Sequence, residues 1–204
     1  MFRITNTILF LLLIQLGLRA QSMELLPSTE YVFADIQFLE PFDRAYRFTL
    51  FSRTRMQIDY KGQVNFFSGA YFSYTQKKGW GTTFLGRVNN AEVGADGGIH
   101  YSQNRTNWSF FGLLAKDLTE PGGFSWFSIL RHRLRLNETW KAYSSLELFI
   151  AMDGGNHIAS LQRIRIGLDR MGYQFGLGFN WLELGNAFLF LNDTYGIFIR
   201  KEFK

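Results

Sequence analysis

The chain has 204 residues and no cysteine, so disulfide bonds and thiolate metal sites are excluded. Its 22 lysines and arginines against 17 acidic residues give a formal net charge of +5. This small surplus does not match the concentrated basic surface of nucleic-acid-binding proteins, so we expect no nucleic-acid partner. The sequence is 47% apolar and 18% aromatic, which favours a β-rich protein with much apolar surface.

The first twenty residues have the pattern of a secretory signal peptide. Arg3 precedes an apolar run from Ile8 to Ile14, and Leu18-Arg19-Ala20 offers a cleavage site. The run is shorter than the roughly 20 residues of a membrane-spanning helix, and a buried amphipathic helix is the alternative. Removal of residues 1–20 takes away two arginines, so the net charge falls from +5 to +3. We expect residues 21–204 to form one exported domain.

After residue 30 the sequence alternates between apolar and polar residues with a period of two, as β-strands do. In segment 45–60 one face carries Tyr46, Phe48, Leu50, Met56, Ile58 and Tyr60, and the other carries Arg47, Arg53, Arg55, Gln57 and Asp59. A helical period of 3.6 would scatter both sets around the axis. The pattern therefore predicts an all-β protein.

Ten strands are predicted, with eight or twelve as alternatives. Their ranges are 31–39, 45–60, 63–75, 82–101 (bulged near Asn89-Asn90), 107–115, 124–136, 139–151, 161–169, 173–184 and 195–203. A turn at Asn89-Asn90 together with a strand at 188–191 would give twelve. The connections alternate between short and long, and the long ones are expected at 41–44, 76–81, 116–123, 152–159 and 185–194. This asymmetry, and an even strand number, are typical of a closed antiparallel transmembrane β-barrel.

The apolar rows favour a barrel that turns its apolar face to lipid and its charged face to the lumen. Most rows begin or end with an aromatic residue, as membrane interfaces require: Tyr46, Tyr60, Trp126, Trp140, Tyr173 and Trp181. Tyr46 and Tyr60 lie about 46 Å apart along a strand, which a tilt of about 45° reduces to roughly the membrane thickness. An exported soluble β-barrel or sandwich with the opposite orientation, acting as a binding protein, is the alternative.

The carboxyl-terminal segment Tyr195–Lys204 resembles the last strand of small outer-membrane β-barrel proteins of Gram-negative bacteria. Alternate residues are apolar and Phe203 lies near the end, although Lys201 falls on the apolar side and Lys204 follows the aromatic residue. The resemblance implies location in the outer membrane after export through the inner membrane. It also implies contact with outer-membrane lipid and delivery to the barrel-insertion machinery by the strand ending at Phe203.

The inward rows are rich in arginine, which predicts a cationic lumen. The candidate lumen and anion-binding residues are Arg53, Arg55, Arg131, Arg133, Arg135, Arg163 and Arg165. In the predicted pairing of segments 124–136 and 139–151, Arg131 opposes Ser145 and Arg135 opposes Lys141. This register leaves Arg133 and Arg135 short of acidic partners nearby. We expect a narrow pore, a binding protein or a structural barrel without enzymatic activity, and the cluster as a site for a small anionic solute.

His100 and Ser102 are the weak candidates for catalysis, because residues two apart share one face of a strand. Their spacing is similar to the His-x-Ser of outer-membrane lipid A deacylases, so the resemblance implies a lipid hydrolase as the alternative function. A polar pair near a strand end is the simpler interpretation. His132 is expected at a strand end on the apolar face, and His157 in a solvated loop. No metal site and no cofactor are predicted.

Overall fold

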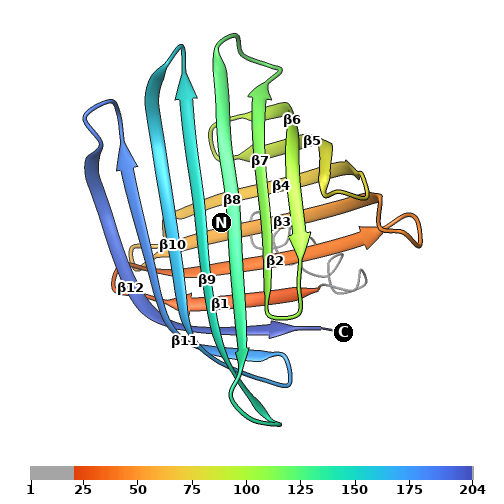
Figure 1. Ribbon diagram of the computed structural model, residues 1–204. Helices are drawn as coiled ribbons and strands as arrows, with labels where there is room; N and C mark the ends of the chain where they lie inside the picture. Colours follow the sequence, from red (N-terminus) through yellow and green to blue (C-terminus); the bar gives the residue numbers. More distant parts are fainter. Residues whose placement is uncertain (1–20, 204) are drawn as a thin grey trace, which may run out of the picture.

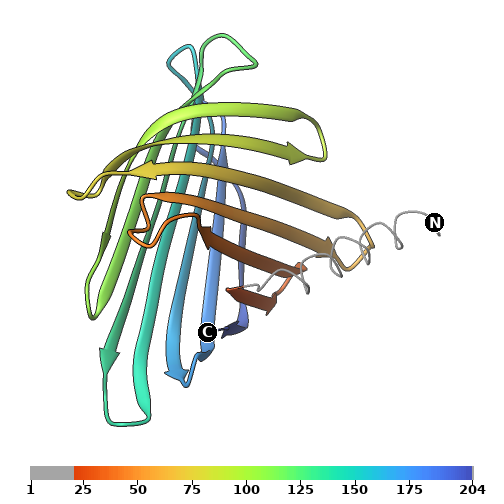
Figure 2. The ribbon, with the colours of Figure 1, turned by 90° about the vertical axis from the view of Figure 1, so that its right-hand side faces the viewer.

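The computed structural model describes residues 21–203, with the side chains of 189–192 excepted, and these residues form one closed antiparallel barrel (Figures 1 and 2). The strands are β1 (Ser22–Pro27), β2 (Tyr31–Pro41), β3 (Phe48–Asp59), β4 (Val64–Thr75), β5 (Trp80–Asn89), β6 (Val93–Asn104), β7 (Trp108–Asp117), β8 (Gly123–Arg135), β9 (Trp140–Asp153), β10 (Asn156–Arg170), β11 (Tyr173–Leu184) and β12 (Leu189–Glu202). The expected signal peptide, residues 1–20, lies outside the described residues.

Each strand pairs with its neighbours in sequence, and β1 pairs with β12 to close the barrel through the registers Ser22 with Glu202 and Leu25 with Ile199. In Figure 1 strands β7 to β10 run upright while β1 to β4 run across them on the far wall. Strong tilt of this kind is required when a sheet closes on itself. No helix in the described part of the chain is long and apolar enough to span a membrane.

The barrel has twelve strands, so the main estimate of ten is wrong; the alternative of twelve is right, its turn near Asn89-Asn90 is confirmed, and its separate strand at 188–191 is not. Segment 82–101 is two strands, because the Asn89 side chain accepts hydrogen bonds from the N–H groups of Ala91 and Glu92 and forms a tight turn. The other additional strand is β1, which the prediction omitted. Residues 188–191 do not form a strand of their own, since β12 already begins at Leu189.

The expected asymmetry between short and long connections is also wrong. The longest turn covers only residues 42–47, at the rim that carries both ends of the described chain, which we call the terminal rim. At the opposite rim, Gly154 and Gly155 alone connect β9 to β10. Both have positive φ, as a two-residue hairpin turn demands. The 152–159 segment is therefore mostly strand.

Asp43 organises the 42–47 turn. Its Oδ1 accepts hydrogen bonds from the backbone N–H groups of Phe48 and Arg47 at 2.9 and 2.7 Å. Its Oδ2 accepts a longer one, 3.3 Å, from the N–H of Ala45. The N–H of Phe48 and then those of Arg47 and Ala45 lower the pKa of Asp43 from its usual value, because they stabilise the ionised carboxylate.

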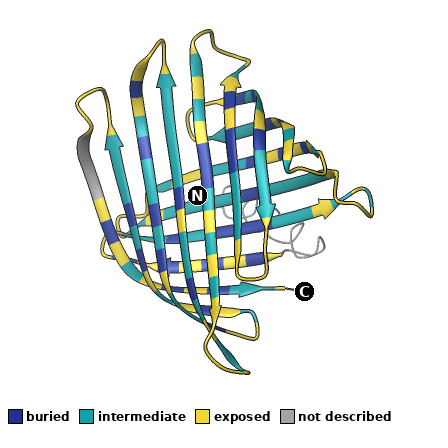
Figure 3. Ribbon diagram, viewed as in Figure 1, coloured by how far each residue is buried: buried dark blue, intermediate teal, exposed yellow. Residues whose placement is uncertain are grey.

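The outward face of the barrel is apolar between its two rims. Exposed outward side chains include Phe72, Phe84, Ile99, Leu130, Ile166, Leu177 and Ile197. In the described strands, charged residues at outward positions occur only toward strand ends: Glu40, Lys116, Arg170, Glu183, Asp193 and Lys201. Figure 3 shows exposed and buried residues following one another along several of the strands. A continuous apolar surface of this extent is typical of a surface that contacts a membrane or another protein.

Aromatic residues concentrate at both rims of this apolar belt. Tyr46, Trp80, Trp108 and Tyr173 lie near the terminal rim, and Tyr60 and Trp126 lie near the opposite one. Lys201, the cation on the apolar side of β12, lies with its Nζ 3.4 Å from the ring centroid of Tyr173, and this cation–π contact accommodates the charge.

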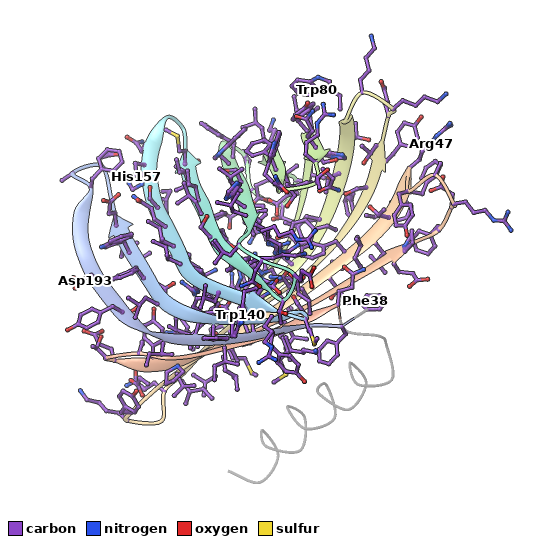
Figure 4. The ribbon with its side chains drawn as sticks, turned by 60° about the horizontal axis from the view of Figure 1, so that its bottom comes forward. Phe38, Arg47, Trp80, Trp140, His157 and Asp193 are labelled. Atoms are coloured by element: carbon purple, nitrogen blue, oxygen red, sulfur yellow. The ribbon has the colours of Figure 1, made fainter. Side chains whose placement is uncertain are left out.

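The inward side chains fill the middle of the barrel. One apolar cluster joins Tyr71, Leu85, Leu113, Ala115 and Phe127, and a second joins Leu26, Phe33, Tyr143 and Phe198. Figure 4 shows side chains from opposite walls projecting into the interior. Ion pairs complete the packing between these two clusters.

Candidate functional site

Glu147 holds the centre of the lumen closed. Its carboxylate lies 2.8 Å from Arg53, 2.9 Å from Arg163 and in direct hydrogen-bond contact with Arg55. Arg53 lies on β3 and Glu147 on β9, which are six strands apart in either direction around the barrel. A direct ion pair between opposite walls means that the lumen is blocked by side chains at this level.

Other lumen arginines are also paired with carboxylates. Arg53 binds Asp35 at 2.5 Å, and Arg165 donates to Glu24 of β1 at 2.8 Å. Arg133 contacts Glu202 of β12 directly. The predicted strand register, with Arg131 opposite Ser145 and Arg135 opposite Lys141, is confirmed. The acids within ion-pair distance of Arg133, Glu202 of β12 and Asp169 of β10, come from strands that are not adjacent to β8.

Arg131 and Arg200 share an uncharged acceptor. Arg131 Nη2 and Arg200 Nη2 lie 2.9 and 3.3 Å from Gln37 Oε1, and Gln37 Nε2 donates to Asp35 at 2.8 Å. No described carboxylate lies within ion-pair distance of Arg131, whereas Arg200 has two at the limit of that distance, Glu202 at 3.9 Å and Glu24 at 4.0 Å. The Nε atoms of both arginines are buried without a hydrogen-bond partner. We call this arrangement the Gln37 site.

The Gln37 site lies on the wall of a cavity of about 720 Å³ that opens at the terminal rim. The charged residues that line this terminal chamber are five arginines and one glutamate: Arg53, Arg105, Arg131, Arg133, Arg200 and Glu202. Aromatic rings, among them Phe51, Tyr71, Phe111 and Phe127, line it as well. The chamber therefore combines excess positive charge with apolar ring faces.

A second cavity of about 730 Å³ lies at the opposite rim. Its charged lining residues are Glu30, Asp59 and Lys61, and amides of Gln57, Gln63, Asn65 and Asn180 line it too. The two cavities differ in charge, because the arginine surplus is confined to the terminal chamber.

Two cations that the alternation placed inward lie at the terminal rim. Arg135 is exposed and its Nε donates to the carbonyl of Asn137. Arg47 is exposed in the 42–47 turn (Figure 4) because β3 begins only at Phe48. Neither residue reaches the Gln37 site.

His100 and Ser102 both line the terminal chamber, but the structure shows no hydrogen bond between them. His100 is buried, its Nδ1 lies 2.8 Å from Thr83 Oγ1, and its Nε2 lies 2.9 Å from Thr75 Oγ1. Both ring nitrogens are therefore engaged by threonines. His132 is exposed on the outward face of β8, whereas His157 is buried in β10 and not in a solvated loop.

Arg87 gathers three carboxylates near the opposite rim, those of Glu92, Asp96 and Asp117. Since the arginine lies among them, the cluster is an ion-pair network. Within residues 21–203, no group of three histidine or acidic side chains has the arrangement of a metal site.

The sequence analysis did not identify Gln37 and Arg200, which form the Gln37 site with Arg131, or Glu24, which pairs with Arg165. Alternation within 195–203 already places Arg200 on the inward side, so that residue was within reach. Gln37 and Glu24 act through partners on strands distant in sequence, and their roles depend on how the barrel closes.

Comparison with known proteins establishes the fold. The sequence matches no protein family and no curated protein. The structure is similar to that of KdgM porin, with a TM-score of 0.55 at 8% identity over 90% of this chain and 99% of that one. It is similar to KdgM porin in complex with disordered oligogalacturonate as well, with a TM-score of 0.53 at 8% identity and the same coverage. LpxR from Salmonella typhimurium aligns with a TM-score of 0.43 at 8% identity over 89% of this chain and all of that one. The chain thus shares the closed β-barrel fold of KdgM porin.

Proposed function

We propose that this protein is an outer-membrane β-barrel of a Gram-negative bacterium that binds a small anionic solute in its terminal chamber. The apolar belt, the aromatic residues at both rims and the closed sheet support the location, because lipid cannot satisfy open strand edges or charged outward residues. The barrel contacts outer-membrane lipid along this belt, and the strand ending at Phe203 addresses it to the insertion machinery.

The Gln37 site carries the binding proposal. Arg131 and Arg200 converge on one neutral oxygen and repel each other, and only Arg200 has carboxylates nearby, those of Glu202 and Glu24 at 3.9 and 4.0 Å. Their unpaired Nε donors point to a missing acceptor, since a buried donor without an acceptor costs free energy. An anionic group in the terminal chamber supplies the missing charge and the missing acceptors.

A carboxylated sugar is our choice of probe ligand. The KdgM porin complex contains oligogalacturonate, a chain of acidic sugars, in a barrel of the same fold. The terminal chamber offers arginines for carboxylates and ring faces for the apolar side of a sugar. Binding and not catalysis is the role proposed for the lumen, and the closed centre argues against a permanently open pore.

Calorimetric titration of the refolded barrel with trigalacturonate tests the proposal. We expect binding that weakens with added salt, and at least tenfold weaker binding when Arg131→Gln and Arg200→Gln are combined. Charge-assisted hydrogen bonds of about 1.5–3 kcal/mol correspond to such a loss. Arg135→Gln, which removes the same charge from the exposed end of the same strand, should change the affinity less than twofold.

Equal binding of trigalacturonate and of an uncharged trisaccharide would contradict the proposed ligand class, as would equal losses in the chamber and control variants. Recovery of the chain as a soluble periplasmic protein would favour the exported soluble barrel instead. A shift in gel mobility between boiled and unboiled samples confirms that each variant is folded.

A further inference from the structure

A histidine and a serine are hydrogen-bonded to each other on the outward face of β10, outside the lumen. His157 Nε2 lies 2.6 Å from Ser160 Oγ, and His157 Nδ1 lies 2.7 Å from the carbonyl oxygen of Gly185. Because a carbonyl oxygen only accepts hydrogen bonds, Nδ1 carries the ring proton and Nε2 accepts from the serine hydroxyl. This is the polarity in which an imidazole removes the proton of a nucleophilic serine.

A β-bulge brings the two side chains to one face. His157 pairs with Met152 of β9 and Ala159 pairs with Ala151, so the register shifts around Ile158. The inserted residue places His157 and Ser160, three positions apart, on the outward side together. Without the bulge they would point to opposite sides of the sheet.

His157, labelled in Figure 4, and Ser160 lie near the start of β10, close to the rim opposite the chain termini. On β11 the direct neighbour of Ser160 is Glu183, an acidic residue at an outward position. At this depth a membrane lipid presents its headgroup and the ester linkages of its acyl chains. The position therefore suits an ester substrate that arrives from the lipid.

The turn from Gly185 to Phe188 covers the pair. Asn186 Oδ1 accepts a hydrogen bond from the backbone N–H of His157, and the Phe188 ring stacks on the imidazole at 4.1 Å. His157 and Ser160 are consequently only 6% and 5% exposed, whereas Phe188 is 57% exposed. Phe188 has a φ of +48°, an unfavourable conformation for a residue with a side chain. Backbone strain of this kind would be relieved if the Phe188 ring moved away from the pair.

We propose that Ser160 and His157 form an ester-hydrolase site for the acyl esters of membrane lipids, with Phe188 as its cover. Ser160 Oγ attacks the ester carbonyl carbon while His157 Nε2 takes the hydroxyl proton. The bond to the alcohol oxygen then breaks, the alcohol takes that proton, and an acyl-serine remains. Water, deprotonated by His157, releases the fatty acid and restores the serine. This activity is separate from anion binding in the lumen.

Labelling with a fluorophosphonate, which reacts with activated serines, tests the proposal on the refolded full-length barrel in detergent. We expect mass spectrometry to locate the label on Ser160, and the same sample to release fatty acid from phospholipid vesicles. Ser160→Ala should abolish both signals, and His157→Gln should slow labelling about 100-fold or more, as loss of a general base does. Phe188→Ala should speed labelling severalfold.

Ser144→Ala is the matched control, because Ser144 is another outward serine on the adjacent strand β9 and should leave both signals unchanged. Boiled and unboiled mobility shows which variants are folded. If neither the unaltered protein nor Phe188→Ala is labelled at Ser160 while both are folded, the pair only anchors the turn and the proposal is overturned. Labelling at Ser160 that persists in folded His157→Gln at full rate would overturn it too.

Discussion

At the scale of single residues, Glu147 has the greatest structural effect in the lumen. One carboxylate contacts Arg53, Arg55 and Arg163, and its side chain is only 6% exposed. A buried charge cluster of this kind is stable only when each cation has its acid, because both kinds of charge have lost their hydration. The neighbouring Asp35 compensates Arg53 but makes no ion pair with Arg55 or Arg163 in the described residues.

Glu147→Gln should therefore lower the free energy of unfolding by about 3–5 kcal/mol, the usual effect of removing one partner from a buried ion pair. Urea titration of the barrel in lipid vesicles, followed by gel mobility, measures it. Glu202→Gln removes a carboxylate whose side chain is 27% exposed, so it should cost clearly less. If Glu147→Gln and the unaltered chain unfold at the same urea concentration, water already compensates the charges of the three arginines.

At the scale of strands, the alternation of apolar and polar residues predicted most of the strands, but it did not predict β1, whose pairing with β12 closes the barrel. A six-residue strand such as β1 contains only three inward positions, too few for a recognisable pattern, and it is defined by its pairing with β2 and β12. The turn after Asn89 depends on a side chain replacing backbone hydrogen bonds, which apolar periodicity does not detect. Likewise, Arg131 was placed inward correctly, but its contact with Gln37 joins strands six apart in the barrel.

Strand β8 offers a direct test of which face meets lipid. Leu130 lies near the middle of its outward row and Leu134 near the terminal rim, 42% and 49% exposed. Leu130→Arg should cost about 2–4 kcal/mol in lipid and Leu134→Arg about 0–1, since the cost of a cation falls toward the interfaces. The same urea titration in vesicles measures both. Equal and small effects would indicate that this face meets water.

At the scale of the whole molecule, the lumen is two chambers separated by a closed centre. The terminal chamber has a surplus of arginines, whereas the chamber at the other rim is lined mainly by amides and has no such surplus. A ligand bound by Arg131 and Arg200 meets Arg53 at the back of the same chamber, where Arg53 also binds Asp35 and Glu147. If the terminal chamber binds an anion as proposed, that binding and the integrity of the closed centre would be coupled through the shared Arg53 guanidinium.

The short turns have a consequence for how the protein meets its surroundings. No connection between strands of residues 21–203 is longer than the six residues between Pro41 and Phe48, so little of the chain projects beyond the apolar belt. In the proposed location, proteinase K added to intact cells should leave the barrel uncut, while a barrel with a protease site inserted at Gly154-Gly155 should be cleaved if that rim faces outward. In the proposed location, antibodies and phages that depend on protruding loops would have little of residues 21–203 to bind.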